Sequence, residues 1–291
     1  MNRYKIGLVT TVALALVFSP GRVLAKKHAT NSSPTPSENG AMPSNGSDPG
    51  GHSASGFEAE KKHDYEKAIA EFTKAIEAEP QDAKNYFNRA TAFRAAGKLP
   101  EALADFSKAI ELAPQSAPGY LGRGEVELAQ KQIEPALADF EKAVQLAPND
   151  LAARRFRAFV FSSKGEWEKA IADYTKVIEK MSDDTQARDR RAFAFRNLKK
   201  YNEAIADYSK VIAKTPEDPE EFRRRGLTYM MAGDSERAAA DFRAVLKIKP
   251  DDTDAQSRLR ALETRANATP PVVGAPSPAS PALAPPGASP R

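Results

Sequence analysis

Proline recurs at intervals of 34 residues along most of this chain, at Pro80, Pro114, Pro148, Pro216 and Pro250. The missing member of the series falls at Ser182. An alanine column has the same period: Ala68, Ala102, Ala136, Ala170, Ala204 and Ala238. So does an aromatic column: Phe72, Phe106, Phe140, Tyr174, Tyr208 and Phe242. One fixed period over most of a chain is the signature of a stacked repeat architecture. The periodicity therefore predicts the fold, but it does not identify a binding partner.

Each unit of the repeat contains two stretches of helical apolar periodicity separated by a turn signal. These turn signals are His63-Asp64, Gly97-Lys98, Lys131-Gln132, Gly165-Glu166, Lys199-Lys200 and Gly233-Asp234. An acidic or amide residue that can cap the next helix follows each unit, as at Asp82 and Asp184. No alternating run of strand length competes with this pattern, so each unit is predicted to be an antiparallel pair of helices.

The spacing Asn88-Arg89-Ala90, Phe93, Gly97, Glu101-Ala102, Asp105-Phe106, Ala109 and Pro114 resembles the tetratricopeptide repeat, here of the kind found in exported bacterial proteins. The resemblance covers residues 53–252, about six units, and a capping helix is expected at residues 253–264. It implies an all-α, right-handed superhelical solenoid whose inner wall is lined by the first helix of each pair. The first unit departs from the pattern, because its leading helix before His63 is short. Ser182 in place of proline is expected to let the preceding helix run slightly longer.

An arginine column in the first helices is matched by an aspartate column 16 residues later. The arginines are Arg89, Arg123, Arg157, Arg191 and Arg225, and the aspartates are Asp105, Asp139, Asp173, Asp207 and Asp241. Residues equidistant from the turn of an antiparallel hairpin face each other. One internal salt bridge per unit is therefore predicted, with the arginine stem packed between helices. The alternative is a ladder of anion-binding sites.

The two ends of the chain have a different composition from the repeats. Residues 1–25 combine a basic start, an apolar run and small residues at Val23-Leu24-Ala25, which predicts a secretory signal cleaved after Ala25 and a periplasmic or, alternatively, secreted protein. A retained membrane anchor is the competing interpretation, but its apolar stretch is shorter than the roughly 20 residues that a spanning helix needs. Residues 26–55 are predicted to be a disordered linker, residues 56–266 the solenoid, and residues 267–291 a disordered Ala/Pro-rich tail.

Composition and motifs argue against several classes of function. The chain has no cysteine, which excludes disulfides and thiolate metal sites. Its formal charge is +4, but residues 1–25 carry three basic residues and no acid, so the processed chain would carry +1. A near-neutral charge argues against nucleic-acid binding. The three histidines form no metal-binding pattern and no catalytic fingerprint is present, so neither an enzyme, a metal nor a cofactor is expected.

Residues spaced i, i+4 and i+7 on the first helices are predicted to line a concave groove. They are Phe87, Thr91, Arg94, Leu121, Arg155, Phe159, Phe193, Arg196, Arg223 and Met230. Large apolar and cationic groups on one face indicate a protein or peptide partner with an acidic or carboxylate-bearing segment. The carboxylate clamp of the resembled family is absent, because Phe87, Thr91, Gly122, Ala152 and Phe156 occupy its places. Trp167 is predicted to be a packing residue.

The sequence thus predicts a non-catalytic protein–protein interaction scaffold of the cell envelope. The alternative is a module that binds an anionic glycan or supports polysaccharide export. The two differ in mechanism, because a polyanion is held mainly by charge whereas a peptide also needs apolar contacts such as Phe159 and Phe193. The oligomeric state does not follow from the sequence.

Overall fold

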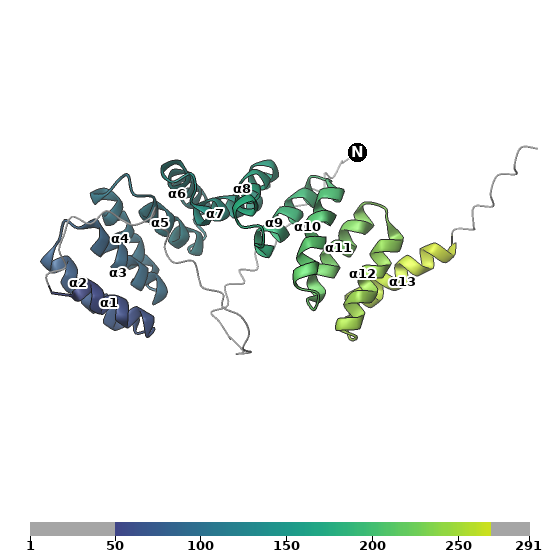
Figure 1. The fold of residues 1–291 in the computed structure, drawn as a ribbon, viewed down its shortest axis with the longest axis horizontal. Helices are drawn as coiled ribbons and strands as arrows, with labels where there is room; N and C mark the ends of the chain where they lie inside the picture. Colours follow the sequence, from purple (N-terminus) through teal and green to yellow (C-terminus); the bar gives the residue numbers. More distant parts are fainter. Residues whose placement is uncertain (1–49, 269–291) are drawn as a thin grey trace, which may run out of the picture. The chain divides into compact units, whose positions relative to one another are not determined.

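The computed structural model describes residues 50–268, and this part of the chain contains thirteen α-helices and no strand (Figure 1). The first seven helices are α1 (His52–Lys61), α2 (Tyr65–Ala78), α3 (Ala83–Ala95), α4 (Leu99–Leu112), α5 (Ala117–Ala129), α6 (Ile133–Leu146) and α7 (Leu151–Ser163). The others are α8 (Trp167–Lys180), α9 (Thr185–Asn197), α10 (Tyr201–Lys214), α11 (Pro219–Met231), α12 (Ser235–Ile248) and α13 (Thr253–Ala268). The predicted all-α repeat is confirmed.

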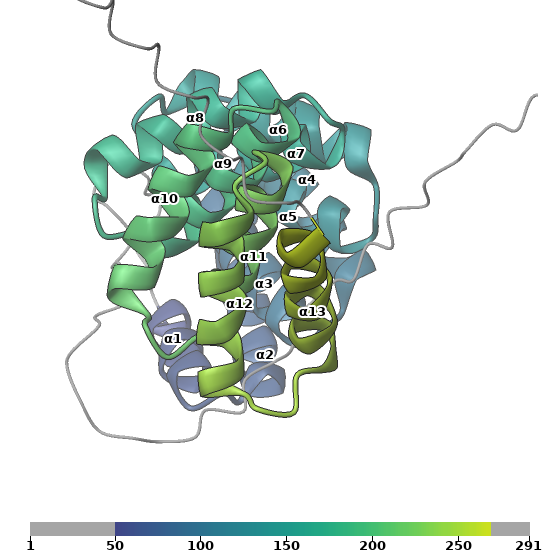
Figure 2. The same cartoon turned by 90° about the vertical axis from the view of Figure 1, so that its right-hand side faces the viewer.

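Each odd-numbered helix packs against the even-numbered helix that follows it, and each pair then packs on the next. The last helix, α13, packs against α12 at the C-terminal end of the stack (Figure 2). Because the contacts of each unit are with the units next to it, each unit is stabilised by its neighbours on either side. The predicted capping helix is confirmed at this end.

The turn inside every pair is a left-handed helix stop at the position that the sequence predicted. Positive φ angles occur at His63, Gly97, Lys131, Gly165, Lys199 and Gly233. At Gly97 the φ angle is 76°, and the next amide, Lys98 N, donates to the carbonyl of Phe93 at 2.9 Å. This bond closes the end of α3 and turns the chain directly into α4.

The alanine and aromatic columns form the core between the two helices of each pair. All six alanines and all six aromatic rings of these columns are fully buried. Small residues on the first helix allow the close approach: a Cβ on Gly124 would lie 2.8 Å from the Phe140 ring. The small residue of the first helix and the aromatic ring opposite it therefore set the helix separation, because a larger residue at Gly124 would push the two helices apart.

All five predicted arginine–aspartate salt bridges are present. In each unit the arginine Nε and Nη2 donate to the two carboxylate oxygens at 2.7 to 2.9 Å. Four of the arginines also use Nη1 to reach a hydroxyl of the preceding unit, on Thr73, Ser107, Thr175 or Ser209. Arg157 lacks such a hydroxyl, and Arg154 Nη1 joins it on Asp173 at 2.9 Å. These pairs are structural and hold three helices together, so the alternative of a ladder of free anion sites is not what the geometry shows.

The helix before Ser182 is not longer than its equivalents, contrary to the expectation from the missing proline. Helix α8 ends at Lys180 and has 14 residues, like α4 and α6. Met181 adopts φ −124° and ψ 77°, close to the values of Ala113 and Ala147 at the equivalent position. The backbone leaves the helix one residue before the proline site, so the pyrrolidine ring is not what ends the helix.

The ends of the helical array lie slightly beyond the predicted domain limits. Helix α1 begins at His52, inside the predicted linker of residues 26–55, and His52 Nδ1 lies 2.8 Å from Glu71 Oε2 of α2. Helix α13 continues to Ala268. The predicted signal at residues 1–25, most of the linker and nearly all of the tail at residues 267–291 lie outside the described residues. Among the described helices, none is both long and apolar enough to cross a bilayer.

Gly97→Ala and Lys131→Gly should change stability in opposite directions, because both positions are left-handed. Alanine at position 97 meets no atom within 4 Å, so its cost of about 1 kcal/mol is conformational. Glycine at position 131, where φ is 63°, should stabilise the protein by about 0.5 to 1 kcal/mol. Urea unfolding followed by circular dichroism measures both. Lys142→Gly, inside α6, should destabilise instead, and a loss of stability in Lys131→Gly would contradict the argument.

Asp173→Ala should destabilise the protein by about 3 kcal/mol, because it leaves the guanidinium groups of Arg157 and Arg154 without their shared acceptor. Glu179→Ala removes the same charge from an exposed ion pair with Lys176 and should change stability by less than about 0.5 kcal/mol. Thermal unfolding of the two variants side by side gives the comparison. Equal losses would show that the buried pair contributes no more than a surface pair.

Candidate functional site

The first helices of successive units meet one another directly. Helix α1 contacts α3, α3 contacts α5, and α7 contacts α9, in addition to the contacts within the pairs. We call the surface that carries the ten predicted groove residues on α3, α5, α7, α9 and α11 the inner face. Its side chains come from several units, so their contacts could not be derived from one repeat alone.

The apolar residues predicted for the groove differ widely in exposure. Phe87, Leu121 and Met230 are half-buried and pack against the core, and the Phe87 ring makes an edge contact with Phe106. Phe159 is also half-buried. Phe193 of α9 differs, because it is 41% exposed. The inner face therefore presents its main free apolar surface on α9.

Thr91 contributes little free polar surface. Its hydroxyl donates to the carbonyl of Phe87, one turn earlier on α3, at 3.0 Å. The side chain is half-buried. Its hydrogen-bonding capacity is thus used within its own helix.

Three of the four predicted groove arginines are bound by carboxylates of the following unit. Arg94 pairs with Glu125 of α5, and Arg155 pairs with Asp184, which caps α9. Burial lowers the pKa of Arg94. Arg223 pairs with Glu220 in its own helix and with Asp252 before α13. These side chains link neighbouring units and have little charge left for a ligand.

Arg196 and Arg190, both on α9, have no ion pair among the described residues. Each lies over an aromatic ring instead: Arg196 over Phe193, at 5.0 Å from the ring centroid, and Arg190 over Phe159, at 4.9 Å. Trp167 of α8 contacts the Phe193 ring edge-on, with 5.7 Å between centroids. The sequence analysis placed Arg196 on this face but missed Arg190, because Arg190 lies outside the i, i+4, i+7 spacing used to choose the residues.

An acidic cluster lies beside these arginines, where α9 meets α11. Arg224 Nη1 of α11 lies 2.5 Å from Asp189 Oδ1 and 3.1 Å from Glu221 Oε1. Burial, followed by the repulsion of Asp189, raises the pKa of Glu221 to about 7. A similar environment exists on α5, where burial, followed by the charge of Asp139, raises the pKa of Glu127 to about 7. Both carboxyl groups thus titrate near neutral pH.

Two tyrosines place buried hydroxyls under the same part of the inner face. The hydroxyl of Tyr208 has no hydrogen-bond partner within residues 50–268, whereas that of Tyr174 interacts with the hydroxyl of Ser162. Charges on Arg190, Asp189 and Arg155 act on the Tyr174 hydroxyl, whose pKa burial raises to about 12. Arg196, Asp189, Arg224 and Glu221 act on the Tyr208 hydroxyl, whose pKa burial also raises. The sequence signal for these groups was tyrosine in a column that otherwise holds phenylalanine.

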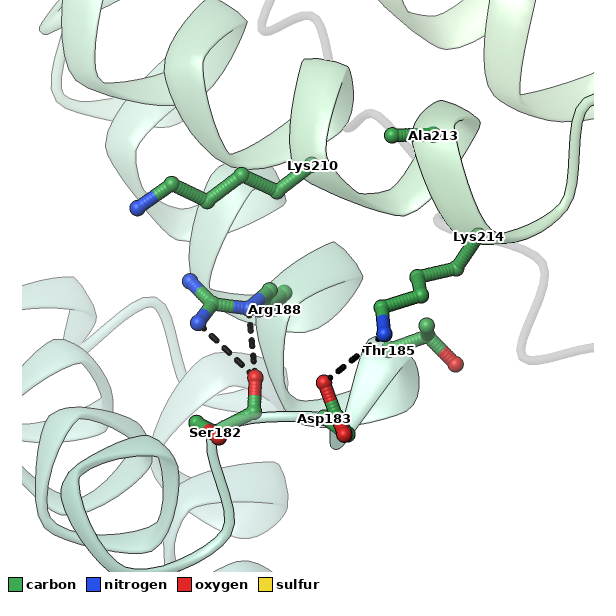
Figure 3. A pocket seen from close by; sticks show the side chains of 7 residues that line it. All are labelled: Ser182, Asp183, Thr185, Arg188, Lys210, Ala213 and Lys214. Carbon is green, nitrogen blue, oxygen red and sulfur yellow. Dashed lines mark hydrogen bonds and ion pairs between the residues drawn. The ribbon is translucent and has the colours of Figure 1, made fainter.

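A separate basic hollow of about 340 Å³ lies by the loop between α8 and α9 (Figure 3). The residues that line it are Ser182, Asp183, Thr185, Arg188, Lys210, Ala213 and Lys214. Arg188 donates to the carbonyl of Ser182, and Lys214 lies 3.0 Å from Asp183. Two of its three cationic side chains are thus held by the protein itself, and the hollow is a weaker candidate than the inner face.

The described part of the chain lacks the ligand arrangements that metal ions need. No group of three or more histidine, aspartate or glutamate side chains is arranged there to hold a metal ion. The carboxylates of the inner face are directed at arginines of neighbouring helices. The site is therefore suited to binding through charge and apolar contact.

Tetratricopeptide repeat family models match residues 58–117 and 190–253, and a second model of the same repeat matches residues 117–150. Together these matches cover more than half of the chain. No relative among curated protein sequences matches it. Repeats of this family generally form non-catalytic scaffolds for protein–protein interaction.

Solved structures with the same fold include YrrB, described as a TPR protein with an unusual peptide-binding site. It is 27% identical, with a TM-score of 0.62, over 65% of this chain and 97% of YrrB. The C-terminal part of a TPR repeat-containing protein from Cytophaga hutchinsonii is 18% identical, with a TM-score of 0.60, over 72% of this chain and 84% of that one. MamA from Desulfovibrio magneticus RS-1 is 19% identical, with a TM-score of 0.55, over 59% of this chain and 97% of MamA. The latter two show the fold alone.

Glu221→Gln should make the protein more stable at pH 8 but not at pH 4. The folded pKa of about 7 lies above the ordinary value of 4.5 for a glutamate, so the protonated carboxyl favours folding at low pH and that contribution is lost as pH rises through 7. The gain at pH 8 should be on the order of 1 to 3 kcal/mol. Urea unfolding at pH 4, 6 and 8 measures it, with Glu179→Gln as an exposed control. A gain that does not depend on pH would contradict the assigned cause.

Proposed function

Because the chain belongs to the tetratricopeptide repeat family, we propose that it is a non-catalytic scaffold that binds a peptide or a protein segment on its inner face. The observation that carries this proposal is the exposed Phe193 between Arg190 and Arg196 on α9. Aromatic residues and arginine are enriched at the cores of protein interfaces, and here both kinds of side chain are available on one helix. The similarity to YrrB, whose description includes a peptide-binding site, supports the same function.

The proposed location is the cell envelope. The basic start, apolar run and small residues of residues 1–25 support export, with cleavage after Ala25 leaving a periplasmic protein. A secreted protein is the alternative. In either case the partner is an envelope or extracellular protein, and the mature chain isolated from cells should begin at Lys26.

Photo-crosslinking in intact cells tests the binding face. A benzophenone amino acid in place of Phe193 should crosslink a specific protein, identified by mass spectrometry, because position 193 is exposed between the two free arginines. The same amino acid in place of Ile248, which is 39% exposed near the end of α12, should not capture that protein. Equal capture from both positions, or none from position 193, would contradict inner-face binding.

The glycan alternative gives a different result in the same experiment. An anionic polysaccharide is held mainly through its charges, so it should be released steeply as salt increases. It would also leave no peptide crosslinked at position 193. Recovery of carbohydrate alone would replace the proposed protein partner by a glycan.

A further inference from the structure

The inner-face arginines fall into two groups according to what neutralises them. Arg94, Arg155 and Arg223 are paired with carboxylates of neighbouring units, as is Arg224 with Asp189. Arg190 and Arg196 are held over aromatic rings and have no carboxylate partner within the described residues. A guanidinium held over an aromatic ring keeps the N–H groups in its own plane available for a further acceptor. The free positive charge of the inner face is thus concentrated on α9.

Two buried tyrosine hydroxyls lie under the same part of the face. Tyr174 and Tyr208 are both fully buried, and the Tyr208 hydroxyl has no hydrogen-bond partner among residues 50–268. A buried hydroxyl without a partner costs about 1 to 3 kcal/mol, whereas phenylalanine fills the same place in four other units without that cost. Arg190 acts on the first hydroxyl and Arg196 on the second. Both hydroxyls are completely covered, so they lie behind the arginines and do not themselves meet a ligand on the face.

The spacing along α9 indicates the shape of the acceptor. Arg190, Phe193 and Arg196 are three residues apart and form one stripe on the helix. At a rise of 1.5 Å per residue, the two arginines are about 9 Å apart along the axis. An extended peptide advances about 3.3 Å per residue and its side chains alternate between two faces, so side chains four positions apart share a face and span about 13 Å. Two carboxylates at that spacing would lie within reach of the long side chains of both arginines, and an apolar residue midway between them would lie against Phe193.

We propose that α9 is a recognition site for an acidic peptide in which an apolar side chain lies between two carboxylates. The proposal rests on the function proposed above and adds the chemistry of the partner. Each carboxylate accepts hydrogen bonds from one guanidinium, and the apolar side chain covers Phe193. Charge complementarity selects the acidic residues, and Phe193 distinguishes such a peptide from a polymer that offers charge alone.

Trp167 provides a direct readout, because it is the single tryptophan of the chain and contacts Phe193. Titration with the blocked peptide Gly-Asp-Ala-Leu-Ala-Asp-Gly should change its emission in a saturable way. The peptide in which both aspartates are replaced by asparagine should bind at least tenfold more weakly. Arg190→Gln and Arg196→Gln should each weaken the aspartate peptide by at least tenfold, whereas Lys247→Gln, an exposed charge on α12, should leave its affinity unchanged.

Tyr208→Phe separates recognition from folding. Removing an unpaired buried hydroxyl should raise the melting temperature and leave the affinity for the aspartate peptide unchanged, because this hydroxyl has no exposed surface to offer a ligand. Equal affinity of the wild-type protein for the aspartate and asparagine peptides would overturn the proposal. So would an anionic polysaccharide such as polygalacturonate that produces the same Trp167 signal with the same dependence on Arg190 and Arg196. Because the asparagine comparison uses the wild-type protein, it holds even if a variant fails to fold.

The two proposals fail in distinguishable ways. If position 193 crosslinks a protein in cells but the aspartate peptide shows no preference over its asparagine counterpart, the scaffold function stands and the acidic recognition is wrong. If position 193 crosslinks no protein, the scaffold function itself is wrong.

Discussion

One arginine–aspartate pair per unit joins the two helices of each hairpin and, in most units, also reaches the hairpin before it. The arginine spans the hairpin to bind both oxygens of its aspartate, and in four of five units it also reaches a hydroxyl of the unit before. A partly buried charge needs all of its hydrogen bonds satisfied, so the pair fixes the register of two helices and of two units together. Apolar columns alone would permit sliding, because alanine and phenylalanine contacts have no direction.

The same need for hydrogen-bond partners separates the arginines of the inner face into those that are paired within the fold and those that are free. Arg94, Arg155 and Arg223 extend to carboxylates of the following unit and strengthen the stacking of the first helices. Arg190 and Arg196 instead lie over Phe159 and Phe193. The part of the face suited to recognition is thus the part that the repeat does not need for its own cohesion.

Most of the fold could be predicted from the sequence, because each unit repeats the same turn residues, packing residues and arginine–aspartate pair. The six turns lie where Gly97, Lys131 and their equivalents indicated, and the salt bridges join Arg89 to Asp105 and its four counterparts. The missing proline was misleading, because Ser182 follows a helix that had already ended at Lys180. The start of α1 at His52 was missed too, since its contact with Glu71 depends on the folded hairpin.

The sequence by itself determined the helix pairs, their turns, their packing columns and the pairing within each unit, because these involve residues at short, fixed separations. The tertiary structure decided which inner-face charges are free. Arg155 and Arg223 each meet the aspartate 29 residues further along the chain, and Arg94 meets Glu125. Arg196 is equivalent to Arg94 in the repeat but has Leu227 at the place of Glu125, so it lies over Phe193 instead. These separations acquire their meaning only in the fold, because the stacking of one unit on the next decides which positions face each other.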